Sequence, residues 1–368
     1  MKSFLQIKRV WFFLLLPICL LVSAIVSRNP GVAEAYATTV YPVISQGINR
    51  ITSIFPYSLM EMLLLYVVLH SIAQIIHLVI LRLRAKERLK NELRQMAANL
   101  LCAAGVITFV FTLTCGLNYS RYTFAEAVGL EVRPSSVAEL KALCNDLAKE
   151  ANRLRAWVPT NDKSVTLLES HVLAGLTAQK TMDTMEPYYP TLRKGYGPPK
   201  PVYLSRVMSY LDITGVYFPF TLEANVNTDA PDYGIPHTML HELSHLQGYM
   251  REDEANFIAY LACRRSDDIL FQYSGAATAF VYANNALYAT DPEAGQETYA
   301  LLSVDVRRDF ADGSAYWKQF KGPIAELSTK INDTYLKSNR QEDGVKSYGQ
   351  MVDLLLADYR APKEAGTA

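Results

Sequence analysis

Residues 237–256 hold closely spaced histidine and acidic side chains that could bind a metal ion. His241-Glu242-Leu243-Ser244-His245 is an H-E-x-x-H sequence. Residues four apart on an α-helix share one face, so both imidazoles can bind the same Zn²⁺. Glu242 is rotated from them by about 100°, which suits a general base acting on a water held at the metal. The pattern predicts zinc hydrolase chemistry, with His241 and His245 as ligands and Glu242 as the catalytic residue.

A catalytic zinc ion usually has three protein ligands and a water, and more than one nearby group could be the third ligand. Glu252 and Glu254 follow Gly248, which favours a helix stop. Either carboxylate could turn back to the metal from a second helix. His237 is a further candidate because it lies four residues before His241, although it also stands where the helix should start.

These residues carry a resemblance to a known group of enzymes. H-E-L-S-H followed by E-D-E-A-N resembles the gluzincin zinc peptidases, whose third ligand is a Glu in an E-x-x-A-D/N segment on a following helix. The resemblance implies that Glu252 is the third ligand and that Asn256 orients a ligand histidine. His245 and Glu252 are closer in sequence than in most gluzincins, which leaves Glu254 open as the alternative.

Longer stretches are similar to a second group. Residues 202–227, 237–263 and 332–359 resemble a bacterial family of membrane-anchored proteins that has three N-terminal spans and carries a domain of unknown function. The family has no established substrate, so the resemblance supports zinc binding more strongly than a cellular role.

The elements that must position the motif begin with membrane segments. Residues 10–27, 59–81 and 97–117 are each apolar and long enough to cross a bilayer. Lys and Arg are concentrated in residues 82–94, and such charge collects on the cytoplasmic side. The sequence therefore predicts a multi-pass cell-membrane protein with a cytoplasmic N-terminus and an extracytoplasmic C-terminal domain.

Composition supports this division and excludes one class of partner. The chain has 368 residues, with 36 Lys+Arg balanced by 36 Asp+Glu, which argues against nucleic-acid binding. The expected partners are the lipid bilayer and a peptide or protein substrate. We expect an α+β, mostly helical fold, with three transmembrane helices within residues 1–117 followed by a zincin-like extracytoplasmic domain at 118–368.

The outer domain has recognisable local patterns. Apolar spacing predicts helices over 136–157 and 164–181, and Pro and Gly predict a loop over 187–201. Residues 202–227 are rich in β-branched and aromatic residues and are predicted to be β-strands. The uncharged run 269–288 is either a buried core helix, which its polar residues favour, or a fourth span.

Features around the motif suggest further roles. Gly215–Asn227 contains Pro219, which is typical of an edge strand, and could pair with an extended substrate or simply pack its aromatic residues. Tyr233, Tyr249 and Tyr273 are candidate oxyanion donors between which the sequence does not choose.

Two cysteines lie beyond the spans. Cys144 and Cys263 could form a disulfide in an oxidising compartment or remain separate buried thiols, and we slightly favour the disulfide.

Two functions are compatible with these observations. The first is a membrane-tethered, zinc-dependent metallopeptidase that hydrolyses peptide bonds on the extracytoplasmic side. The second is a non-catalytic zinc-binding ectodomain that acts as a binding or structural module in the cell envelope. Glu242 favours the enzyme because a structural zinc site needs ligands but no base. Intramembrane proteolysis is disfavoured because the sequence around the motif is too polar for a span.

Overall fold

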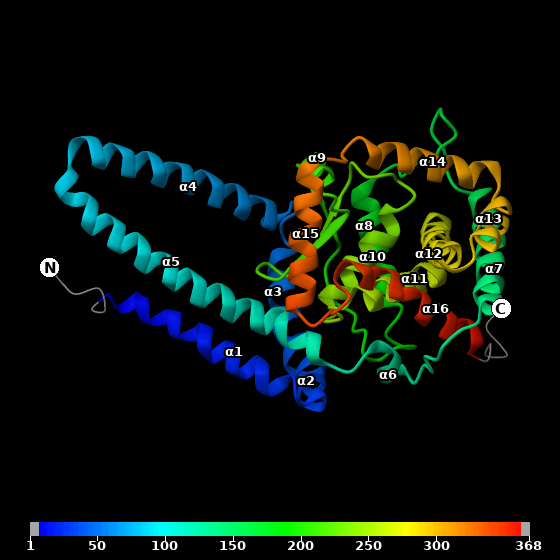
Figure 1. The fold of residues 1–368 in the computed structure, drawn as a ribbon, viewed down its shortest axis with the longest axis horizontal. Coiled ribbons are helices and arrows are strands. Elements are labelled where there is room, and N and C mark those ends of the chain that lie inside the picture. The colour runs from blue at the N-terminus through cyan, green and yellow to red at the C-terminus, as the bar shows by residue number, and fades with distance from the viewer. Residues whose placement is uncertain (1–6, 362–368) are drawn as a thin grey trace.

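The computed structural model describes residues 7–361 and shows a helical body from which long helices project (Figure 1). Among these residues, three helical segments are long and apolar enough to span a membrane. They are Lys8–Val26, whose second part is α1 (Leu15–Val26), then α4 (Leu59–Arg84) and α5 (Lys86–Thr114). The predicted spans 10–27, 59–81 and 97–117 fall within these segments, except for residue 27 at the end of the first and residues 115–117 at the end of the third.

The basic segment between the last two spans, residues 82–94, is helical except at Ala85. Only Ala85 separates α4 from α5, because Lys, Arg and Glu are good helix formers that extend both helices beyond their apolar parts. The third predicted span extends beyond its helix only at its last residues, since α5 ends at Thr114 and Gly116–Ser120 forms a 3₁₀ turn, η4.

The segment between the first two spans belongs to the body. It forms α2 (Pro30–Ala35), a π-helical turn and α3 (Tyr41–Thr52). Tyr41 is fully buried in the main core, and its hydroxyl donates to the carbonyl oxygen of Leu246 over 3.1 Å. The expected division at residue 118 thus omits a part of the chain that packs within the same core.

The strands that the structure describes form one small sheet. β1 (Lys200–Val202) is parallel to β3 (Glu223–Asn227), which is antiparallel to β2 (Gly215–Phe218), giving the order β1-β3-β2. The prediction of strands over 202–227 was therefore wrong in its first half, where α9 (Ser205–Tyr210) intervenes. The run Gly215–Asn227 is a hairpin of which only β2 lies at an edge.

The remaining helices build the body around the sheet. α7 matches its prediction, and so does the loop predicted over 187–201 except for Lys200 and Pro201, which belong to β1. α8 starts seven residues later than expected, at His171 instead of residue 164. The elements are α6 (Phe124–Val128), α7 (Val137–Arg155), α8 (His171–Asp183), α10 (Ile235–Leu246), α11 (Glu252–Arg265), α12 (Ile269–Thr290), α13 (Pro292–Ala300), α14 (Val304–Lys318), α15 (Pro323–Ser338), the 3₁₀ turn η5 (Gly344–Gln350) and α16 (Met351–Arg360).

The uncharged run at 269–288 is a core helix. It lies within α12, whose side chains are largely buried between other helices of the body. α12 is not among the candidate spans of the described residues, so the structure favours the core helix over a fourth span.

The expected disulfide is not formed. Cys144 on α7 and Cys263 on α11 are both free and buried in the main core. Burial raises the pKa of both thiols, that of Cys144 to about 12. They therefore pack as small apolar side chains, and the slight preference for a disulfide was wrong.

Candidate metal centre

The H-E-x-x-H sequence lies on α10, a helix with a defined start and end. Pro236 occupies its first turn, where the missing N–H costs nothing. At the other end Gly248 has φ +91°, a left-handed conformation that favours glycine. A Cβ there would also lie 3.1 Å from the ring of Tyr41. This sharp turn allows α11 to begin at Glu252 and pack against α10.

The two helices bring three ligand-type atoms together. The Nε2 atoms of His241 and His245 are 3.1 Å apart, and they lie 3.1 and 3.4 Å from Oε2 of Glu252. Two ligand atoms bound at 2.0–2.1 Å to a tetrahedral zinc would be separated by about 3.3 Å. All three side chains are buried, and their spacing fits a single Zn²⁺ ion.

Hydrogen bonds orient the imidazoles for this role. Nδ1 of His241 donates to Oδ1 of Asn256, and Nδ1 of His245 donates to the carbonyl oxygen of Tyr249, each over 2.8 Å. With Nδ1 as the donor, each imidazole in its neutral form keeps the lone pair of Nε2 for a metal ion. Oε2 of Glu252 is buried and receives no hydrogen bond from the residues 7–361. A cation would satisfy all three atoms at once.

The charges of these groups are strongly coupled. Burial raises the pKa of Glu252, but the nearby His245 and His241 outweigh it and lower the pKa to about 2. Burial likewise lowers the pKa of His245, but Glu252 outweighs it and raises the pKa to about 9. The carboxylate thus keeps its negative charge in a buried site, as a metal ligand must.

Glu242 lies beside the cluster and is buried too. Burial raises its pKa, and the adjacent histidines and a backbone hydrogen bond from Tyr217 only partly offset this. A Cβ added to Gly215 on the edge strand would come within 2.5 Å of its Oε1, so β2 passes directly against the carboxylate. A buried carboxylate with a raised pKa is a better proton acceptor than an exposed one, which suits a general base.

The other ligand candidates point elsewhere. Glu254 accepts hydrogen bonds from the backbone N–H of Phe124 over 2.9 Å and from Arg251 over 3.0 Å. The Nε2 atom of His237 is bonded to the carbonyl oxygen of Asn256 over 3.2 Å, and burial lowers its pKa to about 3. Of the predicted ligands, the structure brings together His241, His245 and Glu252.

A cleft of about 930 Å³ opens onto the cluster. Tyr233 lines it, whereas Tyr249 and Tyr273, the other candidate oxyanion donors, are buried outside it and donate to Thr191 and Asp309. Sequence reasoning missed four tyrosines that also line the cleft outside the predicted strands, namely Tyr119, Tyr282, Tyr335 and Tyr348.

Tyr348 is the notable omission. Its ring is nearly parallel to that of His241, with 6.5 Å between centroids. The one signal for it was its place in the tail that resembles the membrane-anchored family.

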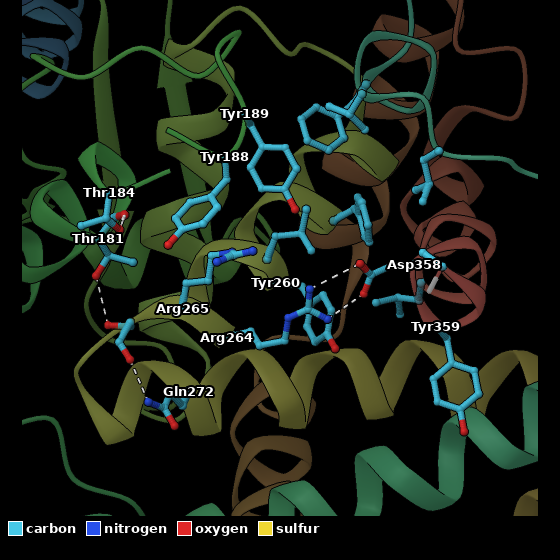
Figure 2. Close-up of a pocket in the computed structure, with 18 of the residues that line it drawn as sticks. Thr181, Thr184, Tyr188, Tyr189, Tyr260, Arg264, Arg265, Gln272, Asp358 and Tyr359 are labelled. Carbon is cyan, nitrogen blue, oxygen red and sulfur yellow. Dashed lines mark hydrogen bonds and ion pairs between the residues drawn. The ribbon is translucent and has the colours of Figure 1, made fainter. Parts of the chain in front are cut away.

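A second, larger cavity of about 2010 Å³ lies apart from this site and is lined by mixed charges and aromatic rings (Figure 2). Arg264 forms a two-pronged ion pair with Asp358, at 2.6 and 3.3 Å, and Arg265 lies 3.7 Å over the ring of Tyr188. Asp358 thus engages Arg264, whereas the buried Nε of Arg265 has no hydrogen-bond partner among residues 7–361. The metal-type cluster of the described residues lies in the other cleft, which is therefore the candidate site.

Comparison with known proteins identifies the family. Residues 36–356 match the family model of DUF3810, described as a protein of unknown function, so the chain belongs to this family. No curated protein and no solved structure matches the chain. The match includes every residue of the metal-type cluster and most of the body.

Proposed function

We propose that this protein is a membrane-tethered, zinc-dependent metallopeptidase that hydrolyses peptide bonds on the extracytoplasmic side. The observation that carries the proposal is the convergence of His241, His245 and Glu252, with Glu242 buried beside them. Three ligands with a neighbouring carboxylate and an open cleft are typical of a catalytic zinc site, whereas structural sites are closed by a fourth ligand.

Different residues of the chain would have different roles in the reaction. Zinc, when bound, supplies a Lewis acid that polarises a carbonyl oxygen and lowers the pKa of a water to about 7. Glu242 takes the proton from the attacking water as the new C–O bond forms. It then gives the proton to the amine nitrogen as the C–N bond breaks. Asn256 and the carbonyl oxygen of Tyr249 hold the two imidazoles in position.

The edge strand β2 offers a place for an extended substrate. It is the outer strand of the sheet order, and Gly215–Phe218 line the cleft. A peptide could pair with its free edge and run past Glu242. Phe218 and Phe220, whose ring centroids are 5.2 Å apart, would then contact alternate side chains of the peptide.

The proposed orientation follows from charge. The basic turn between α4 and α5 lies at the far end of these helices from the body (Figure 1). If this turn is cytoplasmic, the cleft is extracytoplasmic. Blocking of single introduced cysteines by an impermeant thiol reagent, on intact cells, would test the orientation.

The experiment that tests the function uses the full chain in lipid nanodiscs. We expect about one zinc per chain and hydrolysis of a quenched peptide library in the wild type. Glu242→Gln should keep the zinc and lose hydrolysis, while His245→Ala should lose both. Hydrolysis retained by Glu242→Gln would contradict the proposal. Zinc binding without hydrolysis by the wild type would favour the non-catalytic binding or structural module.

A further inference from the structure

The cleft is partly built by the end of a membrane-spanning helix. Phe111 of α5, together with Cys115 and Tyr119 just beyond it, lines the same cleft as the metal-type cluster. Thr114, the last residue of α5, accepts a 2.7 Å hydrogen bond from the hydroxyl of Tyr217. The ring of Tyr217 in turn lies 6.3 Å from that of His245. One tyrosine therefore bridges the end of the span and a metal ligand.

This contact sets the depth of the cleft relative to the bilayer. Phe111 precedes the end of α5 by three residues, which is about 4.5 Å of helix rise. The headgroup layer on each side of the hydrocarbon core is about 5–8 Å thick. With the end of α5 at the edge of the hydrocarbon core, one wall of the cleft lies at the level of the headgroups.

The body is held at this level by buried contacts. The carboxylate of Glu223 on the central strand accepts from the backbone N–H groups of Leu59 and Met60, at 3.2 and 3.0 Å, and so fixes the start of α4. Near the end of α5, the buried guanidinium of Arg121 pairs with Glu34 on α2 at 2.7 Å. The body cannot move away from the bilayer without breaking these bonds.

Exposed apolar side chains surround the same region. Ile324, Leu327 and Ile331 follow one face of α15, and each is between 58 and 62% exposed. Ile331 also lines the cleft. Tyr203, just before α9, and Val207, within α9, are exposed as well. Both helices lie on the side of the body from which α4 and α5 project (Figure 1). Such side chains suit an interfacial layer better than water.

We infer that the substrate is a polypeptide anchored in the same bilayer, and that the cleft accepts its membrane-proximal residues. This inference rests on the proposed peptidase function and adds the substrate class. An extended chain advances about 3.3 Å per residue, so it crosses the headgroup layer in two or three residues and reaches the cleft directly. The preferred bond lies within about ten residues of the anchor.

The test presents one randomised, fluorescence-quenched peptide library to the zinc-loaded full chain in nanodiscs of phosphatidylethanolamine and phosphatidylglycerol. The library is attached to a dipalmitoyl anchor through a Gly/Ser linker of about 4 or about 30 residues, whose mean spans are roughly 11 and 30 Å. Both forms are recruited equally to the bilayer, so only the height of the peptide differs. A third form, attached to a transmembrane helix, separates a requirement for a lipid from one for any anchor.

We expect the short-linker library to be cleaved about ten-fold faster or more, because effective concentration falls steeply with linker length. Equal or faster cleavage of the long-linker library would overturn the inference while leaving the peptidase function intact. If no library is cleaved, the proposed peptidase function is refuted, while the inference about a membrane-anchored partner still has to be tested by binding. Binding is then measured by photo-crosslinking benzophenone-labelled libraries to the Glu242→Gln variant, where an absence of short-linker preference would again overturn the inference.

A pair of variants links the effect to the apolar face. Leu327→Glu places a charge on the exposed face of α15 and should slow cleavage of the short-linker library several-fold, with the long-linker rate unchanged. Leu301→Glu is the matched control, since Leu301 is also half exposed and directly follows α13, a helix on the opposite side of the body (Figure 1). Equal effects of the two substitutions would contradict a role for this face.

Discussion

Replacing Gly215 with alanine should disable the proposed general base while leaving the metal ligands in place. Gly215 opens the edge strand β2, and a Cβ built on it would lie 2.5 Å from Oε1 and 2.8 Å from Cγ of Glu242. It would also lie 2.8 Å from Cγ2 of Thr238. Carbon contacts are normally about 3.5–4.0 Å, so the Glu242 side chain must withdraw by about 1 Å.

The size of the effect follows from this displacement. A misplacement of about 1 Å in a catalytic group can reduce the rate about 100-fold, which corresponds to about 2.7 kcal/mol of barrier. None of the three atoms nearest to the added Cβ belongs to a ligand side chain. We therefore expect kcat to fall between about 10- and 100-fold while zinc content stays at about one per chain.

The assay measures peptide hydrolysis, zinc content and thermal unfolding on the same nanodisc samples. Gly47→Ala is the matched control, because a Cβ on Gly47 within α3 meets no heavy atom within 4 Å. That change should leave kcat and zinc unchanged and stabilise the helix by up to about 1 kcal/mol. Wild-type kcat in Gly215→Ala would refute the placement of Glu242 as the base. Loss of zinc would show that the strand supports the ligands instead.

Three further predictions concern the ligands and the core. Glu252→Ala should lower zinc affinity, as measured by isothermal titration, far more than Glu254→Ala. Glu254→Ala should instead lower the free energy of unfolding by about 1–3 kcal/mol in denaturant, because it leaves buried hydrogen-bond donors unpaired. Equal loss of zinc affinity in the two variants would contradict the assignment of Glu252 as the ligand. Asn256→Ala should weaken zinc binding about 10- to 100-fold because Nδ1 of its histidine partner loses its acceptor, and unchanged affinity would show that this bond does not orient the ring. Tyr41→Ala should destabilise the body by about 3–5 kcal/mol, as measured by chemical unfolding, and a change below 1 kcal/mol would place Tyr41 outside the core.

The parts of the site that sequence predicted are those set by local spacing. His241, Glu242 and His245 share one short helix, and their relative positions follow from its period alone. Gly248 correctly predicted the end of this helix and the turn that follows. The choice of Glu252 over Glu254 could not be made locally, because it depends on Arg251 and Phe124 holding the Glu254 carboxylate away from the cluster.

The errors share one physical cause, which is a partner distant in sequence. α9 replaces a predicted strand because Glu61 accepts hydrogen bonds from the backbone N–H groups of Tyr203 and Leu204 and turns the chain there. α8 starts late because Thr166 is held by Asp309 through both its backbone and its hydroxyl group. Propensity over a short window contains no information about such bonds.

The strand β3 shows how one short segment can join the membrane helices to the site. Its residues alternate between polar and apolar side chains, and all five are buried. Because successive side chains point to opposite faces, Glu223 and Asn225 bond the first turn of α4 and its cap Ser58. Ala224 and Val226 face the other way and belong to the same core as α10. Buried polar groups in a strand are costly unless they are bonded, so docking of α4 stabilises this arrangement together with the ion pair between Glu223 and Lys200. The same five residues therefore join a membrane-spanning helix to the core that contains α10.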